Sequence, residues 1–196
     1  DEAKFNTPVG IALDNAGNIF IADTLNHRIR RVDSAGYVWH VAGNGTAAWA
    51  GDGGLAAEAQ LNYPNDVAVD NAGNVYIADT LNGLIRKVDT QGIITTIAGV
   101  GINAYFGDGG PAVNAGLDYP KSIKLDAEGN LYVADTLANR IRVITAIVRM
   151  MPAAGYSATP ARAGPRWKPI SCSLRPCCSM APGTSLSRTP RTTRSS

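Results

Sequence analysis

The chain has 196 residues, enough for one domain, and its 18 basic and 16 acidic residues give a formal charge of +2. All 16 acidic residues lie in residues 1–145, which carry a net charge of −6, whereas residues 146–196 carry 8 basic residues, no acidic residue and all three cysteines. The charge of the repeat-bearing part therefore disfavours a nucleic-acid partner. The absence of cysteine from residues 1–145 excludes a disulfide framework there. The sequence has no run of 18 apolar residues that would predict a membrane span.

In chain order, a nearly identical stretch recurs three times at a spacing of 56 residues, over residues 8–33, 64–89 and 120–145. A GDGG element recurs at the same spacing, at residues 51–54 and 107–110. A fixed period of this length is typical of β-propellers, in which each repeat forms one blade. We therefore predict the end of a preceding blade at 1–7, repeats at 8–63 and 64–119, and an incomplete third repeat at 120–145, roughly two and a half blades in all.

Turn residues divide each repeat into four short apolar runs, as one four-stranded antiparallel blade requires. In the second copy we predict strands at 67–69, 75–78, 84–88 and 93–98, with an Asp-, Asn- and Gly-rich turn at 70–74. The runs 19–22 and 75–78 are apolar at successive positions, so both faces of each strand should be buried between neighbouring sheets. The predicted fold is all-β: a partial propeller of consecutive four-stranded antiparallel blades.

The repeat residues also resemble a known family. Residues 8–29 fit P-x-G-[IV]-A-[LV]-D-x-x-G-N-[IV]-[FY]-[IV]-A-D-T-x-N-H-R-I, and Asn26-His27-Arg28 holds the place of an Asn-His-Leu motif. This pattern resembles the NHL repeat over residues 8–145, and the GDGG linkers are similar to those of bacterial, often exported, NHL proteins. The resemblance implies a propeller and an extracellular or periplasmic location. The functions that it implies range over protein-binding and RNA-binding scaffolds, sensor domains and a few lyases.

One aspartate recurs in an Ala-Asp-Thr at the end of each second strand, as Asp23, Asp79 and Asp135. These carboxylates could form an acidic ring around a cation. A structural role is favoured, because a residue that every blade demands is expected to shape the blade. In that role each carboxylate clamps a turn and faces an arginine of the third strand, which can be Arg28 or Arg30, Arg86, and Arg140 or Arg142. Of these we take Arg30, Arg86 and Arg142 as the candidates for the clamp.

The long linkers are the predicted place for a ligand, since they exceed what a simple connection needs. Linkers of a propeller cluster on one face, so Asp52 and Asp108 are expected near the central opening. The aromatic side chains beside them make a rim suited to a peptide, glycan or cationic ligand; the candidate residues are Trp49, Asp52, Tyr105, Phe106 and Asp108. Alternatively, residues 56–61 and 112–117 form short helices, with Pro111 at a first helical position and the two aspartates as caps.

Histidine is scarce, which argues against a histidine-held metal. NHL lyases resemble this fold but need several histidines at the ring centre, and the positions that match His27 are Gly83 and Asn139. No nucleophile motif or phosphate-binding loop is visible. We predict no catalytic residue, no metal and no cofactor in this chain.

The predicted function is a binding module or scaffold for a protein, peptide or glycan. Two alternatives stay open: a fragment of a metal-dependent propeller lyase, and a structural spacer of an exported protein. Because blades of an open ring expose apolar sheet faces, missing blades or self-association are expected to cover them. Residues 146–196 lack the repeat pattern. We expect them to be a fourth repeat translated in the wrong reading frame, and therefore a disordered tail.

Overall fold

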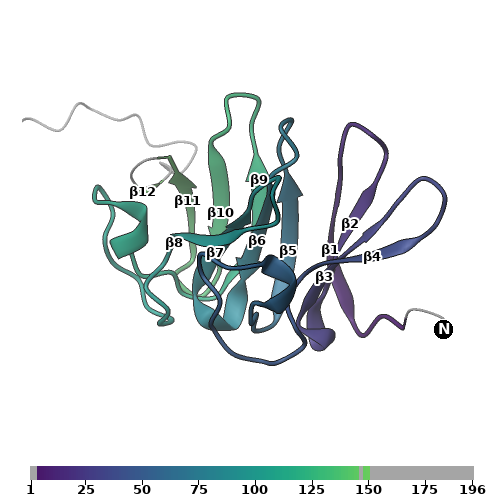
Figure 1. Ribbon diagram of the computed structural model, residues 1–196. Helices are drawn as coiled ribbons and strands as arrows, with labels where there is room; N and C mark the ends of the chain where they lie inside the picture. Colours follow the sequence, from purple (N-terminus) through teal and green to yellow (C-terminus); the bar gives the residue numbers. More distant parts are fainter. Residues whose placement is uncertain (1–3, 146–147, 151–196) are drawn as a thin grey trace, which may run out of the picture. The chain divides into compact units, whose positions relative to one another are not determined.

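The computed structural model describes residues 4–145 and 148–150, which belong to one compact unit. The strands form three four-stranded antiparallel sheets, each with its strands in chain order (Figure 1). Blade 1 contains β1 (Pro8–Leu13), β2 (Ile19–Asp23), β3 (Arg28–Val32) and β4 (Val38–Ala42); blade 2 contains β5 (Pro64–Val69), β6 (Val75–Asp79), β7 (Leu84–Val88) and β8 (Ile94–Ala98); blade 3 contains β9 (Pro120–Leu125), β10 (Leu131–Asp135), β11 (Arg140–Ile144) and β12 (Val148–Met150). Short 3-10 helices lie at η1 (Thr24–Asn26), η2 (Ala56–Glu58), η3 (Thr80–Asn82) and η4 (Ala112–Asn114).

The first strands of the three blades are neighbours. β1 contacts β5 and β5 contacts β9, while β4 and β8 lie at the far edges of their sheets. The all-β fold of consecutive four-stranded antiparallel blades is therefore confirmed. In the part of the chain that the structure describes, no helix is long and apolar enough to cross a membrane.

Two apolar cores fill the spaces between neighbouring blades. Ile77 of β6 packs into the core that blades 1 and 2 share, and Ala78, the next residue, packs into the core between blades 2 and 3. Successive side chains of a strand point to opposite faces, so both faces of residues 75–78 are buried as predicted. The same prediction is wrong for residues 19–22, because no described blade covers the other side of β2 and Ile19 is 37% exposed.

The turn between the first two strands of each blade is organised by its aspartate. Asp70 Oδ1 accepts the backbone N–H groups of Ala72 and Asn74 at 3.0 and 2.8 Å, and Oδ2 accepts the side-chain amide of Asn74 at 2.7 Å. Gly73 follows with a φ of 90°, which a residue without a β-carbon adopts readily. Asp14 and Asp126 make the corresponding bonds in blades 1 and 3.

Blade 3 extends further than the sequence pattern indicates. The prediction left the third repeat incomplete at Thr145, but Val148–Met150 pairs with β11, with Met150 opposite Arg142, and gives the sheet its fourth strand. Backbone pairing supplies this strand where the sequence has no repeat signal. The predictions of a disordered tail and of an out-of-frame repeat concern residues 146–196. Apart from residues 148–150, these lie outside the described part of the chain.

Candidate functional site

A buried aspartate lies at the end of the second strand of blade 2. Asp79 Oδ1 accepts the backbone N–H of Asn62 at 2.7 Å, and Oδ2 accepts the side-chain amide of Asn82 at 2.8 Å. Arg86 Nη1 lies 3.6 Å from Oδ2, and both side chains are fully buried. The carboxylate thereby joins the linker before the blade, the turn after β6 and the third strand.

The other two blades repeat this arrangement. Asp23 accepts the N–H of Asn6 at 2.7 Å and lies 3.1 Å from Arg30; Asp135 accepts the N–H of Asp118 at 2.6 Å and lies 3.1 Å from Arg142. Each carboxylate is held by its own blade and by the segment that leads into it, and its partners are groups of the protein. We therefore propose the turn-clamp role for these aspartates and arginines in place of a cation ring.

Burial raises the pKa of Asp79 to about 6, although the hydrogen bonds from Asn62 and Asn82 and the charge of Arg86 act to lower it. Burial also raises the pKa of Asp135. A raised pKa in the folded state means that folding favours the protonated carboxyl. The clamp of blade 2 is therefore sensitive to pH.

We expect the stability difference between the natural chain and an Asp79→Asn variant to depend on pH. The contribution of Asp79 is full below its ordinary pKa of 3.8 and is lost as the pH rises through about 6. From pH 4 to pH 7 the natural chain should lose on the order of 2–3 kcal/mol relative to the variant, by the linkage of pKa to free energy. Urea denaturation of both chains at each pH measures this difference.

An Asp126→Asn variant is the control for that experiment. The side-chain hydrogen bond from Asn130 lowers the pKa of Asp126, so its stabilising effect is present above the ordinary pKa and is lost as the pH falls. The two variants should therefore show opposite trends. A pH-independent difference for Asp79→Asn would contradict the raised pKa.

The linkers do not run where the sequence analysis placed them. Gly53 donates its N–H to the carbonyl of Ile94 at 2.8 Å, and Ile94 donates to the carbonyl of Gly54 at 3.0 Å, so the first linker pairs with β8, the last strand of the next blade. The expectation that Asp52 and Asp108 meet near the central opening is therefore wrong. Backbone pairing with the outer strand draws the linker away from β1, β5 and β9.

The two linker aspartates contact arginines instead of helix ends. Asp52 accepts Arg86 Nη2 at 2.6 Å and the N–H of Thr96 at 3.1 Å, and Asp108 lies 2.8 Å from Arg142 Nη2. The predicted short helices are single 3-10 turns, and neither has a side-chain cap. Pro111 precedes η4 at the N-cap, one residue before the predicted position.

The aromatic residues of the linkers are accessible. Trp49, Tyr105 and Phe106 are 48%, 38% and 42% exposed, and the first two occupy equivalent positions 56 residues apart. The Tyr105 hydroxyl donates to Asp108 Oδ2 at 2.6 Å, and the Arg140 guanidinium lies 4.4 Å from the centre of its ring. The structure thus brings Tyr105 and Asp108 together, whereas Asp52 lies in the first linker and contacts Arg86 of blade 2.

Sequence reasoning missed Asp66, which joins two blades through their first strands. Its Oδ2 accepts the Ser122 hydroxyl at 2.8 Å and the N–H of Ile123 at 3.0 Å, and Lys124 Nζ lies 3.5 Å away. The signal was a departure from the repeat, since Gly10 and Ser122 hold the equivalent positions. Asp66 fixes β9 against β5.

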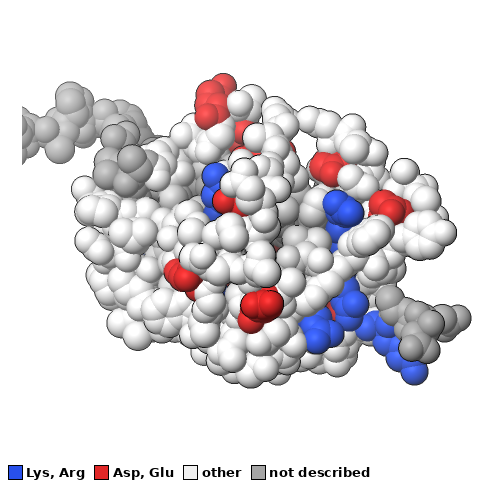
Figure 2. Space-filling model, viewed as in Figure 1, with Lys and Arg blue, Asp and Glu red and all other residues white. Residues whose placement is uncertain are grey.

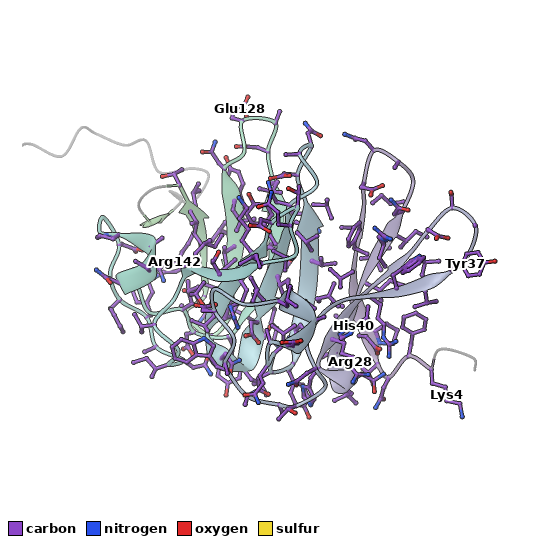
Figure 3. The ribbon with its side chains drawn as sticks, in the orientation of Figure 1. Lys4, Arg28, Tyr37, His40, Glu128 and Arg142 are labelled. Atoms are coloured by element: carbon purple, nitrogen blue, oxygen red, sulfur yellow. The ribbon has the colours of Figure 1, made fainter. Side chains whose placement is uncertain are left out.

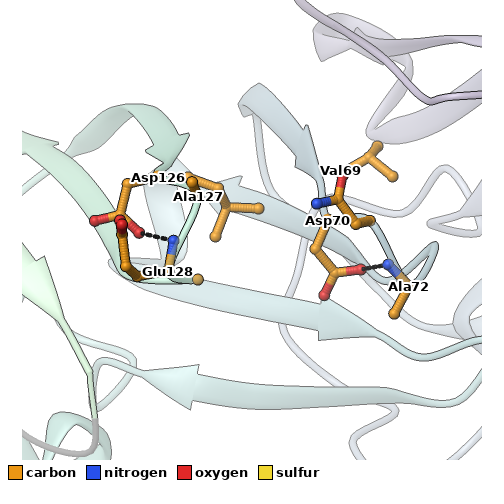
Figure 4. A pocket seen from close by; sticks show the side chains of 9 residues that line it. Val69, Asp70, Ala72, Asp126, Ala127 and Glu128 are labelled. Carbon is orange, nitrogen blue, oxygen red and sulfur yellow. Dashed lines mark hydrogen bonds between the residues drawn. The ribbon is translucent and has the colours of Figure 1, made fainter.

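A polar depression of about 460 Å³ lies between the first turns of blades 2 and 3 (Figure 4). Asp70, Asp126 and Glu128 line it, but the first two carboxylates accept the N–H groups of Ala72 and Glu128 within their own turns. These turns lie at the opposite end of the blades from the chain entering each linker. The acids serve the turns, so we keep the linkers as the candidate ligand surface.

His27 follows η1 with a φ of 53°, and its Nδ1 accepts the N–H of Tyr63 at 3.2 Å. Burial lowers the pKa of this imidazole, which favours its neutral form. The described residues contain no group of three or more His, Cys, Asp or Glu side chains that could hold a metal ion. The histidine is engaged with the next blade.

Two family models match segments of this chain. The NHL repeat model matches residues 5–32, and the Teneurin NHL domain model matches residues 45–106. These matches identify an NHL-repeat segment in the chain. Among curated proteins, NHL repeat-containing protein 2 of Gallus gallus is 40% identical over 105 residues, and Teneurin-1 of Gallus gallus is 36% identical over 95 residues. These matches cover 53% and 42% of this chain but only 14% and 3% of the relatives' own lengths.

Solved structures resemble the three blades. A Bacteroides thetaiotaomicron protein of unknown function is 26% identical with a TM-score of 0.64, covering 77% of this chain and 38% of its own. An auxiliary nutrient binding protein from the same organism is 25% identical with a TM-score of 0.57, covering 69% and 36%. The virginiamycin B lyase of Staphylococcus aureus, at 15% identity and a TM-score of 0.51 over 75% of this chain and 41% of its own, shows the fold alone.

Proposed function

We propose that these NHL blades are part of a protein-binding propeller, and that Trp49, Tyr105 and Phe106 contact the partner. The observation that carries the proposal is the recurrence of an exposed aromatic side chain at one linker position, in Trp49 and Tyr105. Aromatic side chains are over-represented among residues that dominate protein interfaces, because they bury a large area at a small entropic cost.

The linker aspartates support this surface by holding its backbone. Asp52 and Asp108 tie each linker to a buried arginine of the next blade, and Asp108 also fixes the Tyr105 hydroxyl. A rigid frame reduces the entropy lost when a partner binds. Arg140 over the Tyr105 ring adds a positive charge, so the favoured partner is a polypeptide with apolar side chains beside a carboxylate.

Two other functions are alternatives to this proposal. A flat aromatic ring also suits a glycan, and the lyase alternative has the shared fold as its support. The exported location expected from the linkers is a further proposal, which secretion of the natural protein by its host would test. The similarity to an auxiliary nutrient binding protein is consistent with a binding role for the blades.

Peptides selected from a random displayed library on the immobilised chain provide the probe. We expect the dominant binders to lose at least about tenfold in affinity, or about 1.4 kcal/mol, when Tyr105 or Trp49 is replaced by alanine. Tyr37→Ala is the matched control, because Tyr37 is an exposed tyrosine on blade 1, away from the linkers. Binders insensitive to both linker variants would contradict the proposal, and binding to a glycan array in place of peptides would redirect it.

A further inference from the structure

Each described joint between blades uses the same two polar contacts. The linker of the preceding blade brings an aspartate to the third-strand arginine, as Asp52 to Arg86 and Asp108 to Arg142. The threonine hydroxyl after the clamp aspartate donates to the first carbonyl of the next blade, from Thr24 to Pro64 at 2.8 Å and from Thr80 to Pro120 at 2.7 Å. A carboxylate and a hydroxyl therefore fasten each blade to its successor.

Blade 1 carries the receiving half of this joint on its other side. Ile11 is 60% exposed there, whereas the equivalent Val67 and Ile123 are fully buried against the preceding blade. The Arg30 side chain is 17% exposed and pairs with Asp23, while Arg86 and Arg142 are fully buried with two carboxylates each. The difference between these arginines is the linker aspartate.

We propose that this side of blade 1 is a docking face for another NHL blade whose linker supplies an aspartate to Arg30. The docking face comprises Val9, Ile11, Leu13, Ile19 and Arg30. The incoming linker carboxylate binds the guanidinium of Arg30, and the incoming threonine hydroxyl donates to the carbonyl of Pro8, the counterpart of Pro64 and Pro120. The apolar side chains then take the places that Val67 and Ile123 occupy in the two described joints.

Charge favours such a partner. At the blade-1 end of the chain, Arg30 has one carboxylate partner, Asp23, whereas Arg86 and Arg142 have two each. Figure 2 shows basic atoms gathered at that end, and Figure 3 shows Lys4 and Arg28 there, with Arg142 near the opposite end of the described residues. The carboxylate of a GDGG-type linker complements the guanidinium of Arg30.

A second copy of the chain fits less well. Its blade 3 could cover the apolar residues, but residues 146–196 contain no Asp or Glu that could follow blade 3 as a linker carboxylate. Arg30 would then lose water without gaining an acid, which costs free energy. The occupant is therefore a blade with an acidic linker, and self-association is a competing outcome of the test.

The test extends the full chain at its start by a copy of residues 8–56. Residues 1–7 align with residues 57–63, so the extension restores the 56-residue period and brings copies of Thr24 and Asp52. We expect a single unfolding transition with a higher urea midpoint than the natural chain. Hydrogen exchange of the amides in Pro8–Leu13 should slow at least tenfold.

Substitutions then test the pair itself. Changing the added aspartate to asparagine, or Arg30→Met, should lower the midpoint of the extended chain, and the double change should lower it by less than the two shifts combined. Arg30→Met should shift the natural chain less than the extended one. Arg31→Met is the control, since Arg31 lies on the opposite face of β3, over Trp39, and should shift both chains equally.

The hydrogen-exchange comparison needs no substitution and keeps the test decisive if a variant does not fold. An added blade that unfolds separately, unchanged exchange in β1, or equal effects of Arg30→Met in both chains would overturn the proposal. So would a concentration-dependent dimer of the natural chain, seen by light scattering, that Arg30→Met leaves intact.

Discussion

Replacing Arg86 by methionine is expected to lower the free energy of unfolding by about 3–5 kcal/mol, the usual cost of breaking a buried ion pair by removing one partner. The Arg86 side chain is fully buried and lies beside the buried carboxylate of Asp79 and the partly exposed one of Asp52. Methionine fills a similar space but leaves Asp79 without its cation. Urea denaturation followed by circular dichroism measures the loss.

Lys87→Met is the matched control for this substitution. Lys87 is the next residue on β7, is only partly buried and lies 5.7 Å from the centre of the Tyr76 ring, so its loss should cost much less. Combining Arg86→Met with Asp79→Asn should recover part of the lost stability, because the buried charge is also removed. Equal costs for the two methionine variants would show that the ion pair is not the cause.

Gly10→Ala is expected to destabilise the joint between blades 1 and 2 by about 1–3 kcal/mol, the usual cost of overpacking. A β-carbon at Gly10 would lie 2.5 Å from the Asp66 Cα and 2.6 Å from the carbonyl oxygen of Asn65. Both are backbone atoms of β5, so β1 and β5 would have to separate. Thermal or urea denaturation of the variant measures the cost.

Gly54→Ala provides the comparison. Gly54 also lacks a positive φ, and its nearest atom to a new β-carbon is the carbonyl oxygen of Gly51 at 3.4 Å, an ordinary contact. Asp66→Ala would remove the close contact with Asp66 Oδ1 but would not fully rescue Gly10→Ala, because the Asp66 Cα and the Asn65 carbonyl oxygen belong to the main chain. Equal stability of the two glycine variants would mean that the blades can shift without cost.

The sequence predicted most of the blade and little of the linker, for a physical reason. Strands and their turns are encoded locally, by alternating side chains and by residues such as Asp70 and Gly73. The linker path depends on pairing between Gly53 and Ile94, some forty residues apart, for which a local pattern gives no sign. Asp52 was therefore recognised as important but assigned to the wrong neighbours.

Comparing the repeat copies identifies residues that every copy shares and misses a residue that occurs in one copy. Asp23, Asp79 and Asp135 were found because every copy has them, and their expected arginines lie beside them in the structure. Asp66 occurs in one copy and binds the following blade, so a comparison of copies passes over it unless departures are read as well. Strand β12 lies outside the repeat pattern altogether and forms by pairing with β11.

The course of the linker along β8 also bears on solubility. The outermost strand of a sheet presents free N–H and C=O groups that can recruit a strand from another molecule and begin aggregation. In blade 2, Gly53 and Gly54 form hydrogen bonds with the C=O and N–H of Ile94 on that edge, and the Asp52 carboxylate accepts the N–H of Thr96. A protein that grows by adding such repeats thus covers the outer edge of each blade with the linker of the repeat before it.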